Sequence, residues 1–335
     1  MILCFGEILL RLAPDEQGEW LTKNAIDIYP GGAEMNVAAA LAQWRVPVSY
    51  CTAAPNNFLS TQLIKKIKEQ NIDTSTIVYN GNKIGLYYLL KGTEIQHAEV
   101  IYDRNGSSFS ELKSGMIDWD KALNGIRWFH FSAITPALSE NVAAVCKEAL
   151  EACSKKNIFI SVDLNHRPKL WQYGKQANEI MPELVQYCDV IMGNIWSAET
   201  MLNIKVPENI HAINTKENYV GQAKKTSEEI ARLFSKCKIV ANTFRFDKTG
   251  IEYYATIFSN NNFYISSTYK TNAVIDKVGS GDCFMAGLIY GIYNHLPFQQ
   301  IINFATAAAF QKLFIKGDCT NKTVEEVKSF IQHYE

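Results

Sequence analysis

The sequence has no excess of charge of either sign. Its 33 lysine and arginine residues are balanced by 34 aspartate and glutamate residues, which leaves a formal net charge of -1 at pH 7. Proteins that bind nucleic acid or anionic membranes usually carry a basic excess. We therefore expect no nucleic-acid and no membrane partner, whereas small neutral or anionic ligands remain open.

Long hydrophobic runs are also missing. The longest one, from Cys283 to Tyr293, contains two glycines and is about half of the ~20 residues that a membrane span needs. The chain reaches an acid, Glu7, before any basic residue, so its start lacks the basic segment of a signal peptide. These features favour a soluble protein without a secretory leader.

Cysteine pairs with redox or zinc-site spacing are absent. The thiols are scattered through the chain, at Cys4, Cys51, Cys146, Cys153, Cys188, Cys237, Cys283 and Cys319. Most stand in apolar surroundings, where a thiol packs as a small hydrophobic group. We expect reduced cysteines and a cytoplasmic location.

The composition is that of a folded protein with a large core. Hydrophobic residues make up 47% and aromatic residues 12% of the 335 residues, which excludes global disorder. No repeat, low-complexity tract or long Pro/Gly/Ser linker divides the chain. We therefore treat residues 1–335 as one α/β domain.

Strand-like and helix-like segments alternate along this domain. Periodicity predicts strands at 2–10, 48–52, 128–132, 158–163, 190–193 and 239–243. It predicts helices at 33–44, 58–70, 139–155, 227–237, 281–294, 298–313 and 324–334. Such alternation predicts a doubly wound, mostly parallel sheet with helices on both faces.

Two segments, at about 10–30 and 82–104, interrupt this rhythm. Both show β-type alternation without an intervening helix. They predict a small accessory β-sheet that acts as a lid over a site at the carboxyl ends of the main strands. The alternative is two edge hairpins that extend the main sheet.

A glycine turn near the end of the chain carries the strongest chemical signal. Gly279, Ser280 and Gly281 lead directly into an apolar helix. The backbone amides of such a turn form an anion hole. Asp282 follows, and an ionised carboxylate there suits a catalytic base that deprotonates an attacking hydroxyl. The alternative is that Ser280 or Asp282 only caps the helix.

A second glycine pair, Gly31 and Gly32, opens the first predicted helix, with Asn36 one turn later. Backbone amides and the Asn36 amide suit contacts to a ligand's hydroxyl groups. A tight turn followed by a close-packed alanine helix explains the same residues equally well.

Two arginines stand in loops that follow predicted strands. Arg167 comes after the strand ending at Asp163, and Arg104 follows Tyr102 at the end of the suspected lid. Each offers a guanidinium fork for a carboxylate or phosphate. Whether the two loops converge is not decided by the sequence.

The two glycine motifs together resemble the signatures of the ribokinase-like (PfkB-type) carbohydrate kinases. The matching stretches run from Gly31 to Ala39 and from Gly279 to Asp282, and the resemblance covers the whole chain. The segments 163–171, 102–108 and 316–318 resemble the 2-keto-3-deoxygluconate kinase group within that family.

This resemblance implies an ATP- and Mg²⁺-dependent kinase that phosphorylates the primary 6-hydroxyl of 2-keto-3-deoxygluconate, with Asp282 as the base. The implied sugar-binding residues are Gly31, Gly32, Asn36, Tyr87 (or its neighbour Tyr88), Tyr102, Arg104 and Arg167. The implied nucleotide-binding residues are Asn194, Thr243 and Arg245. No metal ligand is assigned, and a homo-oligomer formed through the lid is one alternative for the assembly.

The chain departs from the family pattern at three places. Lys277 precedes the glycine turn where the family often has threonine, and Ser197 stands where an acid follows Asn194. Arg245 takes the place of the glycine in a Thr-x-Gly strand end. These departures put the magnesium and nucleotide contacts in doubt.

Three other functions compete with a sugar-acid kinase. A kinase for a neutral hexose such as fructose needs the same motifs. A dinucleotide oxidoreductase is disfavoured because no Gly-x-Gly-x-x-Gly follows the first strand. A non-catalytic sugar-binding protein of similar fold is disfavoured by Asp282.

Overall fold

The computed structural model describes residues 1–14, 18–21, 24–89, 100–211, 215–247 and 250–334. Among these residues, nine strands form the main sheet, in the spatial order β14-β13-β12-β11-β10-β9-β1-β4, with β15 beside β13. The parallel strands are β4 (Val48–Cys51), β1 (Ile2–Phe5), β9 (Trp128–Ser132), β10 (Phe159–Asp163), β11 (Val190–Gly193) and β12 (Ile239–Asp247). The antiparallel strands are β13 (Ile251–Ser259), β14 (Asn262–Ile265) and β15 (Tyr269–Thr271).

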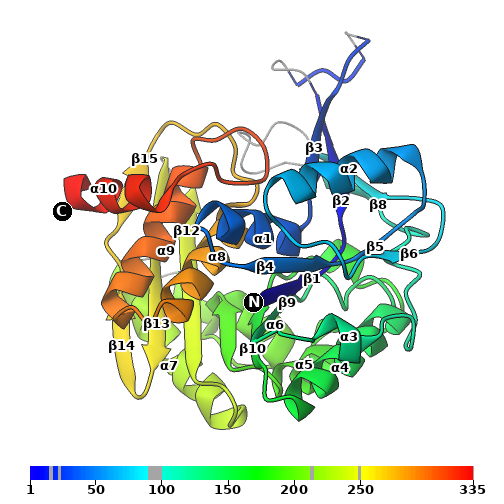
Figure 1. The fold of residues 1–335 in the computed structure, drawn as a ribbon. Coiled ribbons are helices and arrows are strands. Elements are labelled where there is room, and N and C mark those ends of the chain that lie inside the picture. The colour runs from blue at the N-terminus through cyan, green and yellow to red at the C-terminus, as the bar shows by residue number, and fades with distance from the viewer. Residues whose placement is uncertain (15–17, 22–23, 90–99, 212–214, 248–249, 335) are drawn as a thin grey trace.

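Helices cover both faces of this sheet (Figure 1), because neighbouring residues of a strand point to opposite faces. In β1, Ile2 and Cys4 join one hydrophobic core, whereas Leu3 and Phe5 join another. The first core packs against α1 (Ala33–Gln43), α2 (Phe58–Glu69), α8 (Ser280–Tyr293), α9 (Phe298–Lys312) and α10 (Val324–Tyr334). The second packs against α3 (Trp119–Ala122), α4 (Glu140–Lys155), α5 (Ala177–Val185), α6 (Ile195–Leu202) and α7 (Lys216–Leu233). The predicted doubly wound architecture is confirmed.

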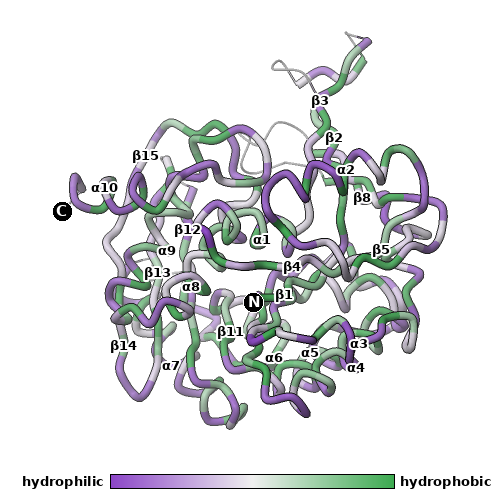
Figure 2. Tube along the Cα trace, viewed as in Figure 1, coloured by the Kyte–Doolittle hydropathy of each residue, from purple (hydrophilic) through white to green (hydrophobic). Residues whose placement is uncertain are grey.

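Hydrophilic residues lie at the outside of this arrangement. Figure 2 shows purple segments at the C-terminal end beside α10 and in the turn next to β14. All eight cysteines are free thiols and seven are buried, as the sequence predicted. No helix in the described part of the chain has the length and hydrophobicity that a bilayer crossing requires.

The observed bounds of some helices and strands differ from the predicted ones, for example where charged residues interrupt the apolar pattern of a helix. The helix predicted at 227–237 begins at Lys216, because Tyr219 and Ala223 are buried among charged neighbours. The strand predicted at 239–243 continues to Asp247 as part of a long hairpin with β13. Helix α5, which contains Pro182, and helix α6 were not predicted.

The two irregular segments form a separate small sheet, in the order β3-β2-β7-β8. Its strands are β2 (Leu9–Ala13), β3 (Asp27–Gly31), β7 (Gly85–Leu89) and β8 (Val100–Asp103). Two antiparallel hairpins are joined by the parallel pair of β2 and β7. The edge-hairpin alternative is therefore wrong. Residues 15–17, 22–23 and 90–99 of the predicted segments lie outside the described residues.

Minor elements complete the described chain. They are the parallel strands β5 (Ala53–Ala54) and β6 (Val78–Tyr79) and the 3-10 helices Pro168–Leu170 and Glu208–His211.

Helix α8, which begins at the glycine turn, is fixed by very close packing on α9. A Cβ atom added to Gly287 would lie 2.6 Å from Ala305 Cα, a backbone atom that cannot move aside. In contrast, Gly221 in α7 has nothing within 4 Å of an added Cβ. Only the first of these helical glycines is required by packing.

This contrast gives a stability prediction. Gly221→Ala should raise the free energy of unfolding by about 0.5–1 kcal/mol, because alanine is the better helix former. Gly287→Ala gains the same propensity but overpacks the helix pair, at a cost of about 1–3 kcal/mol, so we expect net destabilisation. Urea unfolding of the two variants measures both effects. Equal stabilisation by both substitutions would contradict the packing argument.

Candidate active site

A cleft of about 630 Å³ opens at the carboxyl ends of the parallel strands. Its walls come from the loops after β10 and β11, from the end of β12, from the first turns of α1 and α8, and from the small sheet. Ligand sites of open α/β sheets lie at this edge, because the loops there converge from several strands.

Most of the predicted site residues meet in this cleft. Those that line it are Gly32, Asn36, Tyr87, Tyr102, Arg104, Arg167, Asn194, Thr243, Arg245, Gly279, Ser280, Gly281 and Asp282. Gly31 is not among the lining residues. It pairs with Leu9 in the small sheet, and an added Cβ would lie 2.6 Å from Asp318 Oδ2. Tyr88, the alternative to Tyr87, instead packs against Trp20.

The glycine turn is shaped by the chain that packs behind it. Gly279 has φ of 76°, and an added Cβ would lie 1.8 Å from the backbone oxygen of Asp318. Only glycine fits there. The helix begins without a side-chain cap, so the alternative that Ser280 or Asp282 merely caps it is wrong. The Ser280 hydroxyl instead donates to the Ala309 carbonyl at 3.0 Å.

The structure changes one member of the predicted anion hole of Gly279, Ser280 and Gly281. The Ser280 amide already donates to the Lys277 carbonyl at 3.4 Å. First-turn amides of a helix have no acceptor within the helix, so the amides of Gly281 and Asp282, with that of Gly279 at the turn itself, are the ones that face an anion in the cleft.

Asp282 is buried and held by an amide. Asn36 Nδ2 donates to Asp282 Oδ2 at 2.7 Å, and Asn36 Oδ1 accepts from Cys319 Sγ at 3.4 Å. Burial raises the pKa of Asp282 to about 7, against the Asn36 hydrogen bond and the nearby charge of Arg167. The carboxyl group thus titrates near neutral pH, where a general base is most effective.

A second buried carboxyl group lines the cleft. Burial, and next the charge of Asp282, raise the pKa of Asp163 well above its ordinary value. From the sequence, Asp163 was noted only as the last residue of a predicted strand and was not assigned to the site. Its place at the end of β10 was the available signal.

The two predicted arginines have different surroundings. Arg104 is buried, and its Nε lies 2.6 Å from Glu7 Oε2. Ser107 Oγ also donates to Glu7. Arg167 is exposed at the cleft and donates to its neighbour's carbonyl at 3.1 Å. No carboxylate of the described residues forms an ion pair with Arg167. Unlike the charge of Arg104, the charge of Arg167 is therefore not neutralised by a neighbouring carboxylate.

The predicted nucleotide residues come from the start of α6, after β11, and from β12. Asn194 Oδ1 accepts from the Ser197 amide at 2.8 Å, and Ser197 Oγ accepts from the Asn194 amide at 2.9 Å. The serine in place of an acid thus completes a helix cap. Thr243 Oγ1 donates to the Gly193 carbonyl at 3.3 Å. Arg245 lies beside Asp247, with 3.9 Å between Nε and Oδ2.

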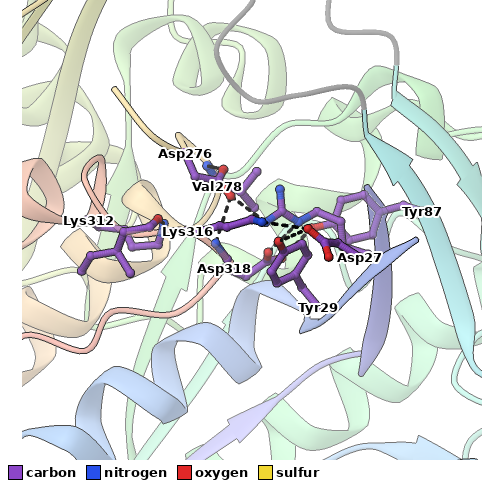
Figure 3. Close-up of polar contacts among 11 residues, drawn as sticks. Asp27, Tyr29, Tyr87, Asp276, Val278, Lys312, Lys316 and Asp318 are labelled. Carbon is purple, nitrogen blue, oxygen red and sulfur yellow. Dashed lines mark hydrogen bonds and ion pairs between the residues drawn. The ribbon is translucent and has the colours of Figure 1, made fainter. Parts of the chain in front are cut away.

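A buried ion network connects the small sheet to the glycine turn (Figure 3). Arg11 of β2 lies 2.6 Å from Asp276 and 2.7 Å from Asp318. Tyr87 of β7 donates to Asp318 at 2.6 Å, so its hydroxyl is already engaged. Asp276 accepts from the Val278 amide at 3.0 Å, immediately before the turn. The sequence does not reveal this network, because Arg11 is 265 residues away from Asp276 and still further from Asp318.

Known proteins match this chain over nearly its full length. The model of the pfkB family of carbohydrate kinases matches residues 1–323. A 2-dehydro-3-deoxygalactonokinase from Haloferax volcanii is 23% identical, with 99% of this chain and 96% of the relative covered. A 2-dehydro-3-deoxygluconokinase from Bacillus subtilis is 24% identical, with 98% and 94% covered.

Solved structures agree with the family match. The crystal structure of a 2-dehydro-3-deoxygluconokinase from Thermotoga maritima is 34% identical, with a TM-score of 0.90 and 99% and 98% of the two chains covered. A fructokinase from Xylella fastidiosa with bound ATP shares the fold at 20% identity, with a TM-score of 0.78 and 99% and 98% covered. The chain belongs to the PfkB family of carbohydrate kinases.

Proposed function

We propose that the protein transfers the terminal phosphoryl group of ATP to the primary 6-hydroxyl of 2-keto-3-deoxygluconate. The observation that carries this proposal is the buried carboxyl group of Asp282. It lies in the cleft at the positive end of α8, and Arg167 is close enough to influence its pKa. The 34% identity to a kinase named for this sugar acid, over 99% of the chain, supports the substrate class.

In the proposed reaction, ionised Asp282 takes the proton of the sugar hydroxyl as that oxygen attacks the terminal phosphorus. The bond between this phosphorus and the bridging oxygen breaks, and ADP leaves with the negative charge. The Gly281 and Asp282 amides hold the transferring group, and the α8 dipole stabilises its charge.

Magnesium fits the donor set of this cleft as a companion of ATP. Among the described residues, no group of three His, Cys, Asp or Glu side chains is placed to hold a metal ion. Magnesium needs only one or two protein carboxylates when phosphates supply other ligands, and Asp163, one of the carboxyl groups that line the cleft, would supply one of them. Bound there, the ion would neutralise phosphate charge.

A carboxylate on the sugar explains the cationic side of the cleft. Arg167 and Arg104 both line the cleft, and Arg167 forms no ion pair with a carboxylate of the described residues. However, Glu7 already neutralises Arg104. This pairing favours the alternative of a neutral hexose such as fructose more than the sequence suggested. If the protein only bound a sugar without catalysis, the raised pKa of Asp282 would have no role.

We also propose that the small sheet acts as a lid. It contributes Leu9, Tyr87 and Tyr102 to the cleft, so it contacts a bound sugar directly. On β3 and β8, Ile28 is 54% and Ile101 is 59% exposed. These apolar side chains support a homo-oligomer through the same sheet, which stays a prediction.

The base assignment is tested by Asp282→Asn, which keeps the shape but removes the proton acceptor. We expect kcat to fall by about a hundred- to ten-thousandfold, with ATP affinity nearly unchanged. A coupled assay of ADP release and calorimetry of ATP binding measure the two effects. Near-normal turnover would show that Asp282 is not the base.

The pH profile of the unchanged enzyme gives a second readout of the same assignment. Because only ionised Asp282 accepts a proton, kcat/KM should rise about tenfold per pH unit below about 7 and level off above it. Asn36 stabilises the ionised form, so Asn36→Leu should move this rise to higher pH. A flat profile between pH 5 and 8 would contradict the role.

Substrate charge should be recognised by Arg167. A charge-assisted hydrogen bond contributes about 1.5–3 kcal/mol, or ten- to a hundredfold in affinity. Arg167→Gln should therefore raise KM for the sugar acid by about that factor and change KM for fructose less. Equal effects on both sugars would remove the basis of the sugar-acid assignment.

Arg104→Gln is the companion variant. If Arg104 binds the carboxylate of the sugar acid, Arg104→Gln too should raise KM for the acid more than KM for fructose. If one arginine serves the transferring phosphoryl group, that variant should lose turnover with every sugar. Arg104→Gln also leaves Glu7 buried and unpaired, at a cost of about 3–5 kcal/mol in stability. Thermal unfolding separates this loss from an effect on binding.

The lid proposal predicts that the sugar, more than ATP, protects the small sheet. We expect slower hydrogen exchange in β2, β7 and β8 with sugar bound, since closure excludes water from their amides. Amides of β14, at the far edge of the main sheet, serve as the control. Equal protection of the small sheet with and without sugar would show that it does not close.

A further inference from the structure

Lys277 has an unusual position for a lysine. Its side chain lines the cleft and is 11% exposed. In the described part of the chain its Nζ has no hydrogen-bond acceptor, although the atom is shielded from solvent. An ammonium group has three donors, and leaving them unsatisfied in a buried place is costly. Acceptor atoms of a bound ligand would satisfy these donors and stabilise Lys277 in this position.

The carboxylate beside Lys277 does not satisfy it. Asp247 Oδ2 lies 3.6 Å from Lys277 Nζ and 3.9 Å from Arg245 Nε, both beyond a hydrogen bond. Asp247 Oδ1 is also buried without a hydrogen-bond donor among the described residues. Two cations thus share one carboxylate. This corner of the cleft has a surplus positive charge, which suits an anion.

The anion must carry several charges and lie near the reacting atoms. Lys277 directly precedes Val278 and the glycine turn, so its ammonium shares the cleft with the free amides of Gly281 and Asp282. Burial lowers the pKa of Lys277, and Arg245 adds to this effect while Asp247 opposes it. A polyphosphate chain would relieve the repulsion between the two cations and supply the missing acceptors.

We propose that Lys277 binds the terminal phosphates of the nucleotide donor, together with Arg245, and that the phosphates displace Asp247 from the two cations. This inference rests on the proposed kinase function and deepens it. Lys277 and Arg245 are the two departures from the family pattern that face this corner, so the chain holds part of its donor with side-chain cations.

Lys277→Met tests the proposal, because methionine keeps the length of the side chain without its charge. We expect the affinity for ATP and for inorganic tripolyphosphate to fall by about ten- to a hundredfold, with the affinity for adenosine unchanged. Lys277→Arg should retain much of the affinity. Calorimetry on the full chain without sugar measures all of these values.

Lys270→Met is the matched control. Lys270 also lies 3.6 Å from a carboxylate, that of Glu252, but the pair is exposed and outside the cleft. Its removal should leave both affinities unchanged. Asp247→Asn should have the opposite sign to Lys277→Met: with metal removed by EDTA, the variant should bind tripolyphosphate more tightly, because the competing carboxylate charge is gone.

The outcomes separate the two proposals. If the wild-type chain binds ATP and Lys277→Met binds it equally well, the role of Lys277 is wrong while the kinase proposal stands. Weaker phosphate binding by Asp247→Asn would equally overturn it. If the wild-type chain binds neither ATP nor tripolyphosphate, both proposals fail. A wrong sugar assignment leaves these measurements unaffected, since no sugar is present.

Discussion

The guanidinium of Arg11 is the contact on which the rest of the site depends. It is buried between Asp276 and Asp318, and burying a charge is costly unless paired charges and hydrogen bonds offset the lost hydration. Asp318 in turn accepts from Tyr87, and Asp276 accepts from the amides of Val278 and Gly317. One cation thereby holds the small sheet, the glycine turn and the loop behind it in a single arrangement. The backbone of that loop then leaves room only for glycine at position 279.

The same burial that makes this network costly also makes the cleft reactive. The carboxyl group of Asp282 is buried, so its pKa rises to about 7 instead of staying near that of a solvated carboxyl group. Asn36 and Arg167 act in the opposite direction and keep an ionised fraction available. In the same cleft, Lys277 and Arg245 lie beside a single carboxylate, that of Asp247. The cleft therefore combines a carboxyl group that titrates near neutral pH with a corner of surplus positive charge, which is the division of charge that the proposed phosphoryl transfer needs.

Much of the fold was accessible from periodicity because most elements present one clear apolar face. Helices α8 and α9 and strands β9 to β11 were predicted nearly to the residue. The failures have a shared cause. In α7 the buried positions are separated by lysines and glutamates, and α5 contains Pro182, which normally argues against a helix. Strands β13 to β15 form the antiparallel edge of the main sheet. The length of β13 is set by its pairing with β12 and not by its own residue pattern.

By itself, the sequence determined the alternation of strands and helices, the β character of the two irregular segments and the local chemistry of the turn from Gly279 to Asp282, because these depend on neighbours a few residues apart. It also supplied nearly every candidate residue of the site, but only the tertiary structure showed that these residues meet in one cleft. Only the tertiary structure decided which groups remain free there. Arg104 is neutralised by Glu7, 97 residues away, and Tyr87 donates to Asp318, 231 residues away. Lys277, in contrast, is left without a hydrogen-bond acceptor in the described part of the chain. Such partners are set by how distant segments pack, and no local pattern of residues records them.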